Sequence, residues 1–266
     1  MLTPSHARVR DVNELPVLEA AVRAAGRAVQ RLRREGFETR MKKADNPVTA
    51  ADLEANRILK EELLGAYPGD GWLSEETRDD RARLASRRVW IVDPIDGTKE
   101  FVTGLPEYSV SVALVDDGRA LAGAVLNPAQ ETLVICARGD GVRRNGKLVR
   151  AERKLGERPV VLASRSEISR GEFKAFEARA EIRAVGSIAW KLALIACGDA
   201  DATFSLGPKN EWDIAAGALL VEEAGGRATD RNREPFLFNR ENTLVHGIVA
   251  VTPQAETRVW SLITSA

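Results

Sequence analysis

Five carboxylates in three short, well-separated phrases place the strongest constraint on how this chain can fold. The phrases are Ser74-Glu75-Glu76, Asp93-Pro94-Ile95-Asp96-Gly97-Thr98 and Glu211-Trp212-Asp213. Hard divalent cations such as Mg²⁺ prefer oxygen ligands, so a cluster of acids can hold several of them. Ions held in this way activate water and attract a phosphate group. If the phrases converge in space, the sequence predicts a Mg²⁺-dependent phosphatase.

Length and charge argue against several other classes of protein. The 266 residues suit one large α/β domain or two moderate ones that share an interface. Lys plus Arg and Asp plus Glu both number 39, so the zero net charge argues against a general binder of nucleic acid or membrane surfaces. The segment from Met1 to Asn13 has no apolar signal core, and no apolar run approaches the roughly 20 residues that span a bilayer. We therefore expect a cytoplasmic protein.

The first half of the chain predicts two helices followed by strands. Amphipathic spacing predicts a helix over residues 15–34, and Thr49 with Asp52 marks the start of a second helix that ends near Gly65 or Pro68. The polar residues 42–47 between them predict a loop. Apolar runs predict strands at 89–92, 109–115, 120–126 and 132–137, with a short one at 142–144. This order indicates an α+β half with an antiparallel sheet.

The second half alternates strands and helices, which indicates an α/β half. Residues 151–158 are charged and carry few apolar side chains, so we place a boundary there, between halves at residues 1–152 and 153–266. The predicted strands are 160–163, 182–185, 202–205 and 248–251. The predicted helices are 169–180, 188–196 and 212–224, and Gly225-Gly226 closes the last of them.

Each acidic phrase also has a plain structural interpretation. Asp-Pro and Asp-Gly pairs favour chain reversal, as in the phrase from Asp93 to Gly97. The alternative for Glu75-Glu76 is a pair of solvated loop acids. Asp213 suits the positive end of a helix, and Asp52 suits a capping box.

The functional interpretation of the same phrases is more specific. A strand delivers Asp93, Asp96 returns its carboxylate to the same side, and a cation relieves the repulsion between them. The amides of Gly97 and Thr98 then face a phosphate at a helix N-terminus. Asp52 accepts a proton from the Thr98 hydroxyl, which would orient an attacking water.

In this order the motifs resemble those of the inositol monophosphatase superfamily, the lithium-sensitive Mg²⁺-dependent phosphatases. The resemblance adds Trp90 before Asp93, and it continues after Trp212-Asp213 with Ala215-Ala216-Gly217 and Glu223-Ala224-Gly225-Gly226. It extends from Val17 to Val251. It implies a layered αβαβα sandwich, which agrees with an α+β half followed by an α/β half.

The resemblance implies a role for each matching residue. The metal ligands would be Glu75, Asp93, Asp96, Asp213 and the carbonyl oxygen of Ile95, and they would hold two or three Mg²⁺ ions. Thr98 with Asp52 would activate the nucleophilic water, and Glu76 would support them or ligate a metal through water. The amides of Gly97 and Thr98 would hold the phosphate.

Within the superfamily, the details resemble the 3′(2′),5′-bisphosphate nucleotidase (CysQ-type) branch. The matching stretches are residues 43–52, Gly97-Thr98-Lys99-Glu100-Phe101 and Gly207-Pro208-Lys209-Asn210. Inositol phosphatases place a Glu that reads ring hydroxyls just before the corresponding Gly, whereas Phe204-Ser205-Leu206-Gly207 has no acid. The first hypothesis is therefore hydrolysis of 3′-phosphoadenosine 5′-phosphate to AMP and phosphate.

Substrate contacts are also predicted at Ser187, Lys191 and Lys209, with Asp213 facing the substrate. Both lysines would meet a second phosphate, and the alternative for each is an exposed surface lysine. The runner-up function is an inositol-1-phosphate phosphatase, or an enzyme that accepts both substrates. A different class, a non-catalytic metal- and phosphate-binding regulator, is disfavoured because every motif position is present.

The expected partner is a small phosphorylated metabolite rather than a nucleic-acid polymer or a membrane. Monomers and dimers both occur among the proteins that this chain resembles, so a homodimer stays open.

Overall fold

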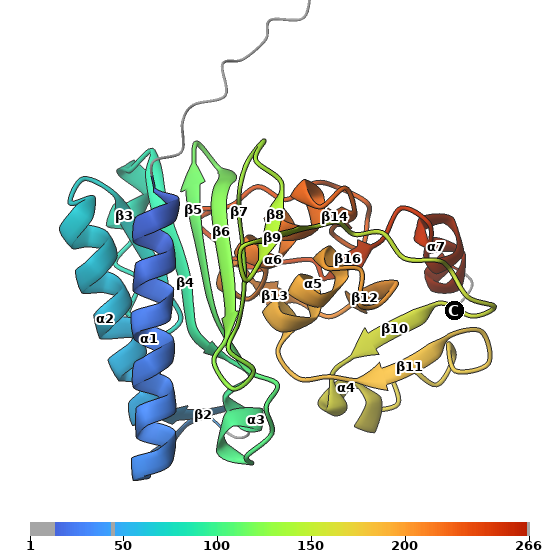
Figure 1. The fold of residues 1–266 in the computed structure, drawn as a ribbon, viewed down its shortest axis with the longest axis horizontal. Coiled ribbons are helices and arrows are strands. Elements are labelled where there is room, and N and C mark those ends of the chain that lie inside the picture. Colours follow the sequence, from blue (N-terminus) through green and yellow to red (C-terminus); the bar gives the residue numbers. More distant parts are fainter. Residues whose placement is uncertain (1–13, 44–45, 265–266) are drawn as a thin grey trace, which may run out of the picture.

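The computed structural model describes residues 14–43 and 46–264, so the segment expected to lack a signal core lies outside the described residues. Helices and sheets alternate in layers (Figure 1). α1 (Leu15–Glu35) and α2 (Ala50–Ala66) cover one face of a large sheet. α5 (Ile188–Ala196) and α6 (Glu211–Glu223) lie between this sheet and a smaller one, and α7 (Glu256–Thr264) packs on the far side of the smaller sheet. The predicted αβαβα sandwich is confirmed.

The large sheet has seven strands in the order β3-β4-β5-β6-β7-β8-β9. β3 runs parallel to β4, and the other neighbours are antiparallel. The prediction of an antiparallel sheet therefore missed β3, which lies directly after a turn-rich stretch. The strands are β3 (Gly71–Ser74), β4 (Arg88–Asp96), β5 (Ser109–Asp116), β6 (Arg119–Asn127), β7 (Thr132–Ala137), β8 (Val142–Arg144) and β9 (Lys147–Val149).

The central strands of this sheet are buried on both faces. Successive side chains of a strand point to opposite faces. In β4, Trp90 and Val92 accordingly pack against α1 and α2, whereas Val89 and Ile91 join the core around α5 and α6. This explains why the strand is an apolar run rather than an alternation of apolar and polar residues. The apolar run ends at Asp93, so β4 places this acid near the end of the strand, where the central core stops.

The smaller sheet has five strands in the order β11-β10-β12-β16-β14. β10 is parallel to β11 and β12, whereas β16 is antiparallel to β12 and β14. The predicted strands of this half are confirmed, with β11 shifted by one residue. The strands are β10 (Val160–Ala163), β11 (Glu181–Ala184), β12 (Ala202–Ser205), β14 (Arg227–Thr229) and β16 (Ile248–Val251).

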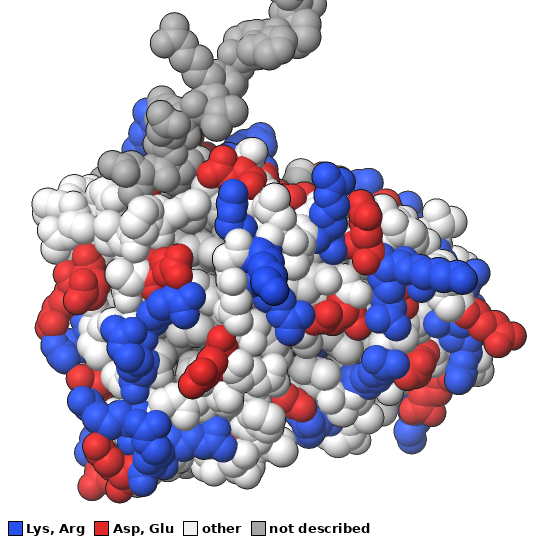
Figure 2. Space-filling view, in the orientation of Figure 1, with Lys and Arg blue, Asp and Glu red and all other residues white. Residues whose placement is uncertain are grey.

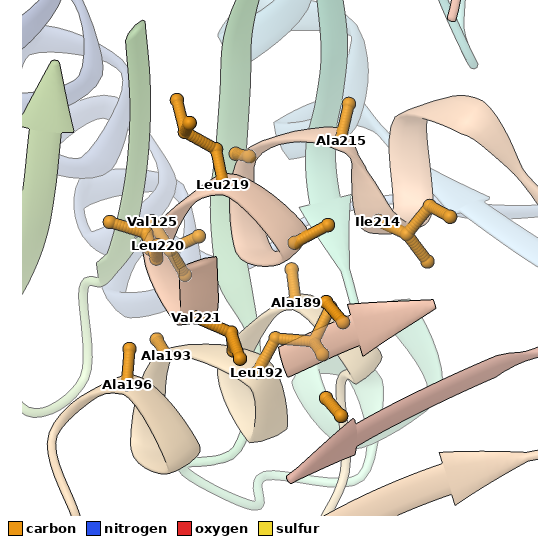
Figure 3. Packing of buried hydrophobic residues seen from close by; sticks show 14 of the residues in the cluster. Val125, Ala189, Leu192, Ala193, Ala196, Ile214, Ala215, Leu219, Leu220 and Val221 are labelled. Carbon is orange, nitrogen blue, oxygen red and sulfur yellow. The ribbon is translucent and has the colours of Figure 1, made fainter. Parts of the chain in front are cut away.

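Small residues let α6 pack closely on both sides. Figure 3 shows Leu192 of α5 close to Val221 of α6 in this packing. A Cβ atom at Gly217 would lie 2.5 Å from a side-chain carbon of Leu192 on α5. A Cβ atom at Gly123 in β6 would lie 3.2 Å from the backbone of Ala216 on α6. Contacts this short leave no room for a larger residue. The position of α6, and with it the position of Asp213 in its first turn, is therefore fixed by the core.

The loop predicted over residues 42–47 is wrong at residues 42–43 and 46–47, which lie in strands. β1 (Thr39–Lys43) pairs with β2 (Asn46–Thr49) in an antiparallel hairpin, of which residues 44–45 lie outside the description. The sequence of β1 is Thr-Arg-Met-Lys-Lys, which lacks an apolar face, so the pattern offered no strand signal. Hydrogen bonding between β1 and β2, rather than an apolar pattern, therefore determines that these residues form strands.

The helix predicted over residues 169–180 is also wrong. A short helix, α4 (Arg165–Ser169), is followed by turns up to residue 179. Gly171 has φ of +78°, a left-handed conformation that interrupts a helix. Phe173 and Phe176 instead pack against Phe204 of β12. The apolar periodicity thus reflected an aromatic cluster and not a helical face.

Charges of both signs are intermixed on the face shown in Figure 2. The central core takes residues from both predicted halves, for example Val89 with Leu219. The boundary near residue 152 stays a prediction.

Candidate functional site

The acidic strand end is shaped by a turn with a left-handed glycine. The Ile95 amide donates to Asp93 Oδ1 at 3.1 Å, and the pairing of β4 with β5 is irregular between Asp93 and Asp96. Gly97 has φ of +90°, and a Cβ atom there would lie 2.9 Å from the carbonyl oxygen of Glu107. Only glycine fits this conformation and this close approach. The turn brings Asp93, Ile95, Asp96 and Gly97 to one cavity of about 590 Å³.

Three acids from the three phrases meet beside this turn. Glu75, Asp93 and Asp213 each offer a carboxylate oxygen, and these oxygens lie within 4.8 Å of one another. Glu75 follows the parallel strand β3, Asp93 lies in β4, and Asp213 lies in the first turn of α6. The Asn210 amide donates to Asp213 Oδ2 at 2.8 Å and leaves the other oxygen for the cluster. The predicted convergence of the phrases is therefore present in the geometry.

Asp96 is held at the N-terminus of α5. Its Oδ2 atom accepts hydrogen bonds from the Ser187 hydroxyl and the Ala189 amide, each at 2.6 Å. Ser187 also caps the helix, because its Oγ accepts from the Trp190 amide at 3.0 Å. Ser187 lines the cavity, but its hydroxyl is already engaged. A substrate contact for Ser187 stays a prediction.

The half-buried Thr98 and the buried Asp52 form a pair next to the acids. The Thr98 hydroxyl lies 3.1 Å from Asp52 Oδ1 and 2.9 Å from the Ile95 carbonyl oxygen. Asp52 Oδ2 accepts from the amide and the hydroxyl of Thr49, so Asp52 does complete the predicted capping box of α2. The structural and the functional interpretations of Asp52 are therefore compatible, because each uses a different carboxylate oxygen.

The acids are crowded enough to resist ionisation. Burial, followed by the charges of Glu75, Asp96 and Asp213, raises the pKa of Asp93 well above its usual range. Burial also raises the pKa of Asp96 to about 6, although the hydrogen bonds from Ser187 and Ala189 oppose it. Burial and the charge of Asp96 raise the pKa of Asp213 to about 8. Carboxylates that repel one another in a partly buried site fit a divalent cation, which would stabilise their charged forms.

We expect Mg²⁺ to stabilise the protein much more at alkaline than at acidic pH. Because folded-state pKa values of about 6 and about 8 lie above the unfolded value for Asp, the metal-free folded state binds extra protons between about pH 4 and pH 8. The contribution of the cluster to stability therefore falls as pH rises through this window, while deprotonation favours metal binding. The measurement is the melting temperature with Mg²⁺ minus that with EDTA, at about pH 5.5 and about pH 8.5. Equal differences at the two pH values would contradict this expectation, and subtraction cancels titrations elsewhere in the chain.

A basic wall faces the same cavity. Lys191 is only 2 % exposed and lines the cavity, so its alternative as a surface lysine is wrong. Burial lowers the pKa of Lys191 to about 8, and the charges of Glu167 and Asp96 oppose this effect. Lys209 also lines the cavity and forms an ion pair with Glu167 at 3.3 Å. One cavity thus contains an acidic wall and a wall with two lysines.

Glu167 is a buried acid that the sequence interpretation missed. It accepts hydrogen bonds from the hydroxyls of Ser205 and Ser164. Burial would raise its pKa, but Lys209, Lys191 and these hydroxyls together lower it to about 2. The pattern Ser164-x-x-Glu167 is a capping-box signature and could have located the start of α4. No local signal joins Glu167 to Lys209.

Arg165, which lines the cavity, forms an ion pair with a further acid, Glu107. Glu107 accepts from both terminal nitrogens of Arg165 and from the Gly186 amide. Burial would raise the pKa of Glu107, but the Arg165 contact and the Gly186 amide lower it. This contact connects α4 to the start of α5, and neither residue carried a motif.

Glu76 is half-buried beside Glu75 but does not belong to the cavity lining as described. Its amide donates to Ser74 Oγ at 3.3 Å. Its role therefore stays a prediction. Trp190 is 2 % exposed and packs in the central core, where partly buried Trp212 joins it.

Comparisons with known proteins agree with this geometry. Residues 13–263 match the model of the inositol monophosphatase family. An inositol-1-monophosphatase of Rhizobium meliloti (strain 1021) is 36% identical over 227 residues, which cover 81% of this chain and 85% of that protein. A protein of Pasteurella multocida (strain Pm70) named Nus factor SuhB is 32% identical over 231 residues, which cover 82% of this chain and 86% of that protein.

A solved structure of a Thermotoga maritima IMPase superimposes with a TM-score of 0.83. It is 28% identical in sequence, and the match covers 95% of this chain and 97% of that one. Among the described helices, none combines the length and the apolar character needed to cross a membrane.

Proposed function

Since the chain belongs to the inositol monophosphatase family, a family of metal-dependent phosphatases that act on small phosphorylated substrates, we propose that it hydrolyses a phosphate monoester with two or three Mg²⁺ ions. The ligands would be the carboxylates of Glu75, Asp93, Asp96 and Asp213 together with the Ile95 carbonyl oxygen. The observation that carries the proposal is the meeting of carboxylate oxygens from three distant segments within 4.8 Å.

The protein side chains have separate tasks in this reaction. Magnesium held by these ligands would lower the pKa of the attacking water and would neutralise charge on the phosphate and the leaving oxygen. The Thr98 hydroxyl donates to Asp52 Oδ1, so the lone pairs of Thr98 Oγ1 can accept a hydrogen bond from the water and orient it. The amides of Gly97 and Thr98 hold the phosphate, and Glu76 supports the water from the neighbouring turn. Positioning of this kind is most of what phosphoryl transfer requires.

We propose 3′-phosphoadenosine 5′-phosphate as the substrate, with AMP and phosphate as products. The support for this choice is the pair of lysines that line the same cavity as the acids. Lys191 is buried and faces the cavity, and Lys209 lies beside it. A second phosphate on the substrate would satisfy both ammonium groups while the first phosphate lies at the metals. A substrate with a single phosphate would leave Lys191 only the charges of Glu167, Asp96 and Glu100 to oppose the cost of its burial.

Inositol 1-phosphate is the second candidate substrate. The relative from Rhizobium meliloti carries the name inositol-1-monophosphatase, which favours this substrate or a dual specificity. Against it, Ser205 ends β12 where the sequence lacks an acid, and its hydroxyl donates to Glu167. Glu167 is 3 % exposed and bound to Lys209, so it offers a ring hydroxyl little access.

A substrate panel separates these candidates. We expect phosphate release from 3′-phosphoadenosine 5′-phosphate to exceed that from inositol 1-phosphate in kcat/KM, and release from both to require Mg²⁺. Equal or better turnover of inositol 1-phosphate would reverse the ranking. Absence of hydrolysis of any small phosphate ester at saturating Mg²⁺ would favour a non-catalytic metal- and phosphate-binding regulator. Lithium forms a further arm of the panel, because it is expected to inhibit by taking the place of one Mg²⁺.

Lys191→Met adds a test of the basic wall within the same panel. Loss of one charged hydrogen bond costs about 1.5–3 kcal/mol, so kcat/KM for the bisphosphate should fall about 10- to 100-fold. Hydrolysis of p-nitrophenyl phosphate, which lacks a second phosphate, should change much less. An equal loss on both substrates would argue against a second-phosphate contact at Lys191.

A cytoplasmic location and homodimer formation stay predictions. Cell fractionation and light scattering, respectively, would test them.

A further inference from the structure

Helix α2 directs two polar side chains toward the site, one turn apart. Residues four positions apart lie on the same face of a helix. Asp52 contacts the Thr98 hydroxyl. Asn56 contacts the turn that follows β3, which carries Glu75 and Glu76. One rigid helix therefore touches both of the acidic turns of the site, although the second contact belongs to no motif.

Asn56 uses both ends of its side-chain amide on this turn. Its Oδ1 atom accepts from the Ser74 hydroxyl at 2.6 Å, and its Nδ2 atom donates to Thr77 Oγ1 at 3.1 Å. Ser74 lies directly before the two acids and Thr77 directly after them. The backbone also joins these two residues, because the Thr77 amide donates to the Ser74 carbonyl at 3.3 Å. Asn56 thus bridges the side chains of the first and last residues of the turn.

The surrounding donors agree with this orientation of the amide. The indole nitrogen of Trp72 is a donor only, and it lies 3.2 Å from Thr77 Oγ1, so this oxygen acts as an acceptor there. Ser74 Oγ accepts from the Glu76 amide, which leaves its proton for Asn56 Oδ1. The turn is also tied to the sheet, because the Glu75 amide donates to the Val92 carbonyl at 3.2 Å. Asn56 supplies a link from the turn to α2.

We propose that Asn56 is a positioning residue that sets Glu75 for metal binding by clamping Ser74 and Thr77. The proposal rests on the proposed function, since it takes Glu75 as a ligand of Mg²⁺. Side chains that orient metal ligands from outside typically contribute 10- to 100-fold to metal affinity. Through Asp52 and Asn56, α2 then holds the turn that carries Glu75 in a fixed position relative to the turn that carries Thr98.

The test is direct measurement of Mg²⁺ binding by isothermal titration calorimetry on the full-length Asn56→Ala variant after removal of metal. We expect the Mg²⁺ dissociation constant to rise about tenfold or more. We expect a smaller loss of kcat at saturating Mg²⁺, because the ligand itself is retained. A dissociation constant within about twofold of the parent value would overturn the proposal, since outer contacts of this kind are worth at least about tenfold.

Two further variants separate positioning from simple loss of stability. Leu59 lies on α2 and is fully buried in the core between α1, α2 and the large sheet. Leu59→Val should therefore lower the melting temperature without changing Mg²⁺ affinity. Thr77→Val removes the acceptor for Asn56 Nδ2, so it should also raise the Mg²⁺ dissociation constant. It provides the test of the proposal if Asn56→Ala does not fold. The double variant Asn56→Ala/Thr77→Val should lose less Mg²⁺-binding free energy than the sum of the two single losses, because the contact between Asn56 and Thr77 can be lost only once.

Measurements of Mg²⁺ binding distinguish failure of the role of Asn56 from failure of the proposed function. Parent protein that binds Mg²⁺ while Asn56→Ala and Thr77→Val bind it equally well would overturn the role of Asn56 alone. Parent protein that binds no Mg²⁺ would overturn the proposed function, and the role of Asn56 with it.

Discussion

Asp93→Asn is expected to remove nearly all turnover and yet to make the metal-free protein more stable. Asp93 is 2 % exposed, and its carboxylate lies among those of Glu75 and Asp213. Charge stabilisation by a catalytic metal is worth several kcal/mol, so loss of this ligand should lower kcat about 10³-fold or more. Stability should change in the opposite direction, because burial and neighbouring charges make the ionised form of Asp93 costly without a cation.

The stability effect is measured in EDTA near neutral pH. An asparagine can still accept the hydrogen bond from the Ile95 amide, so the turn keeps its internal contact. If removal of the Asp93 charge stabilises the fold by about 1 kcal/mol, the melting temperature should rise by about 2–4 °C for a chain of this size. With excess Mg²⁺ the order should reverse, since the parent gains stability from binding and the variant does not.

The exposed Asp140 offers a matched control. Asp140→Asn makes the same chemical change on the surface and should leave both activity and melting temperature unaltered. Near-normal turnover of Asp93→Asn would refute a ligand role for Asp93. A lower melting temperature in EDTA would instead show that the carboxylate stabilises the fold, against the repulsion argument.

Thr98→Val is expected to give the second-largest loss, and it should affect kcat rather than metal binding. Valine keeps the shape of threonine but removes the hydroxyl that lies 3.1 Å from Asp52 Oδ1. Positioned groups that orient or deprotonate a nucleophile contribute about 10²- to 10⁴-fold, so we expect kcat to fall by at least about 10²-fold. The Mg²⁺ dissociation constant should stay close to the parent value, because the carboxylates of the cluster are untouched.

Thr98→Ser is the matched control for this change. It retains the hydroxyl and should retain most of the activity. Hydrolysis by Thr98→Val at a rate close to that of the parent would remove Thr98 and Asp52 from the mechanism. A large rise in the Mg²⁺ dissociation constant would mean that the hydroxyl acts instead through the Ile95 carbonyl oxygen, 2.9 Å away.

The sequence predicted the buried elements well because their residues carry a local pattern. The apolar runs at Ile188–Ala196, Ala202–Ser205 and Ile248–Val251 have the bounds expected of them. The β1–β2 hairpin was missed because its strand residues are polar and its order comes from pairing. The helix expected at 169–180 failed because two phenylalanines at helical spacing pack on Phe204 instead.

The same distinction applies to the site. The acids at 75, 93 and 213 stand in phrases with a chemical meaning of their own, so their meeting could be expected. Asn56 stands in no such phrase, and the capping-box pattern at Glu167 indicates only the start of a helix. Asn56 contacts Ser74 and Glu167 contacts Lys209, and these contacts exist only because separate elements pack side by side. A local pattern does not contain that information.

The central claim is that magnesium lies among the carboxylates of Glu75, Asp93, Asp96 and Asp213. The most direct test is an anomalous difference map from a crystal soaked in Mn²⁺, which takes the same oxygen ligands as Mg²⁺. We predict anomalous density about 2.0–2.2 Å from carboxylate oxygens of Glu75, Asp93 and Asp213, and its absence in a crystal of Asp93→Asn. A well-ordered cavity without such density in the parent protein, at Mn²⁺ concentrations that saturate the crystal, would contradict the account.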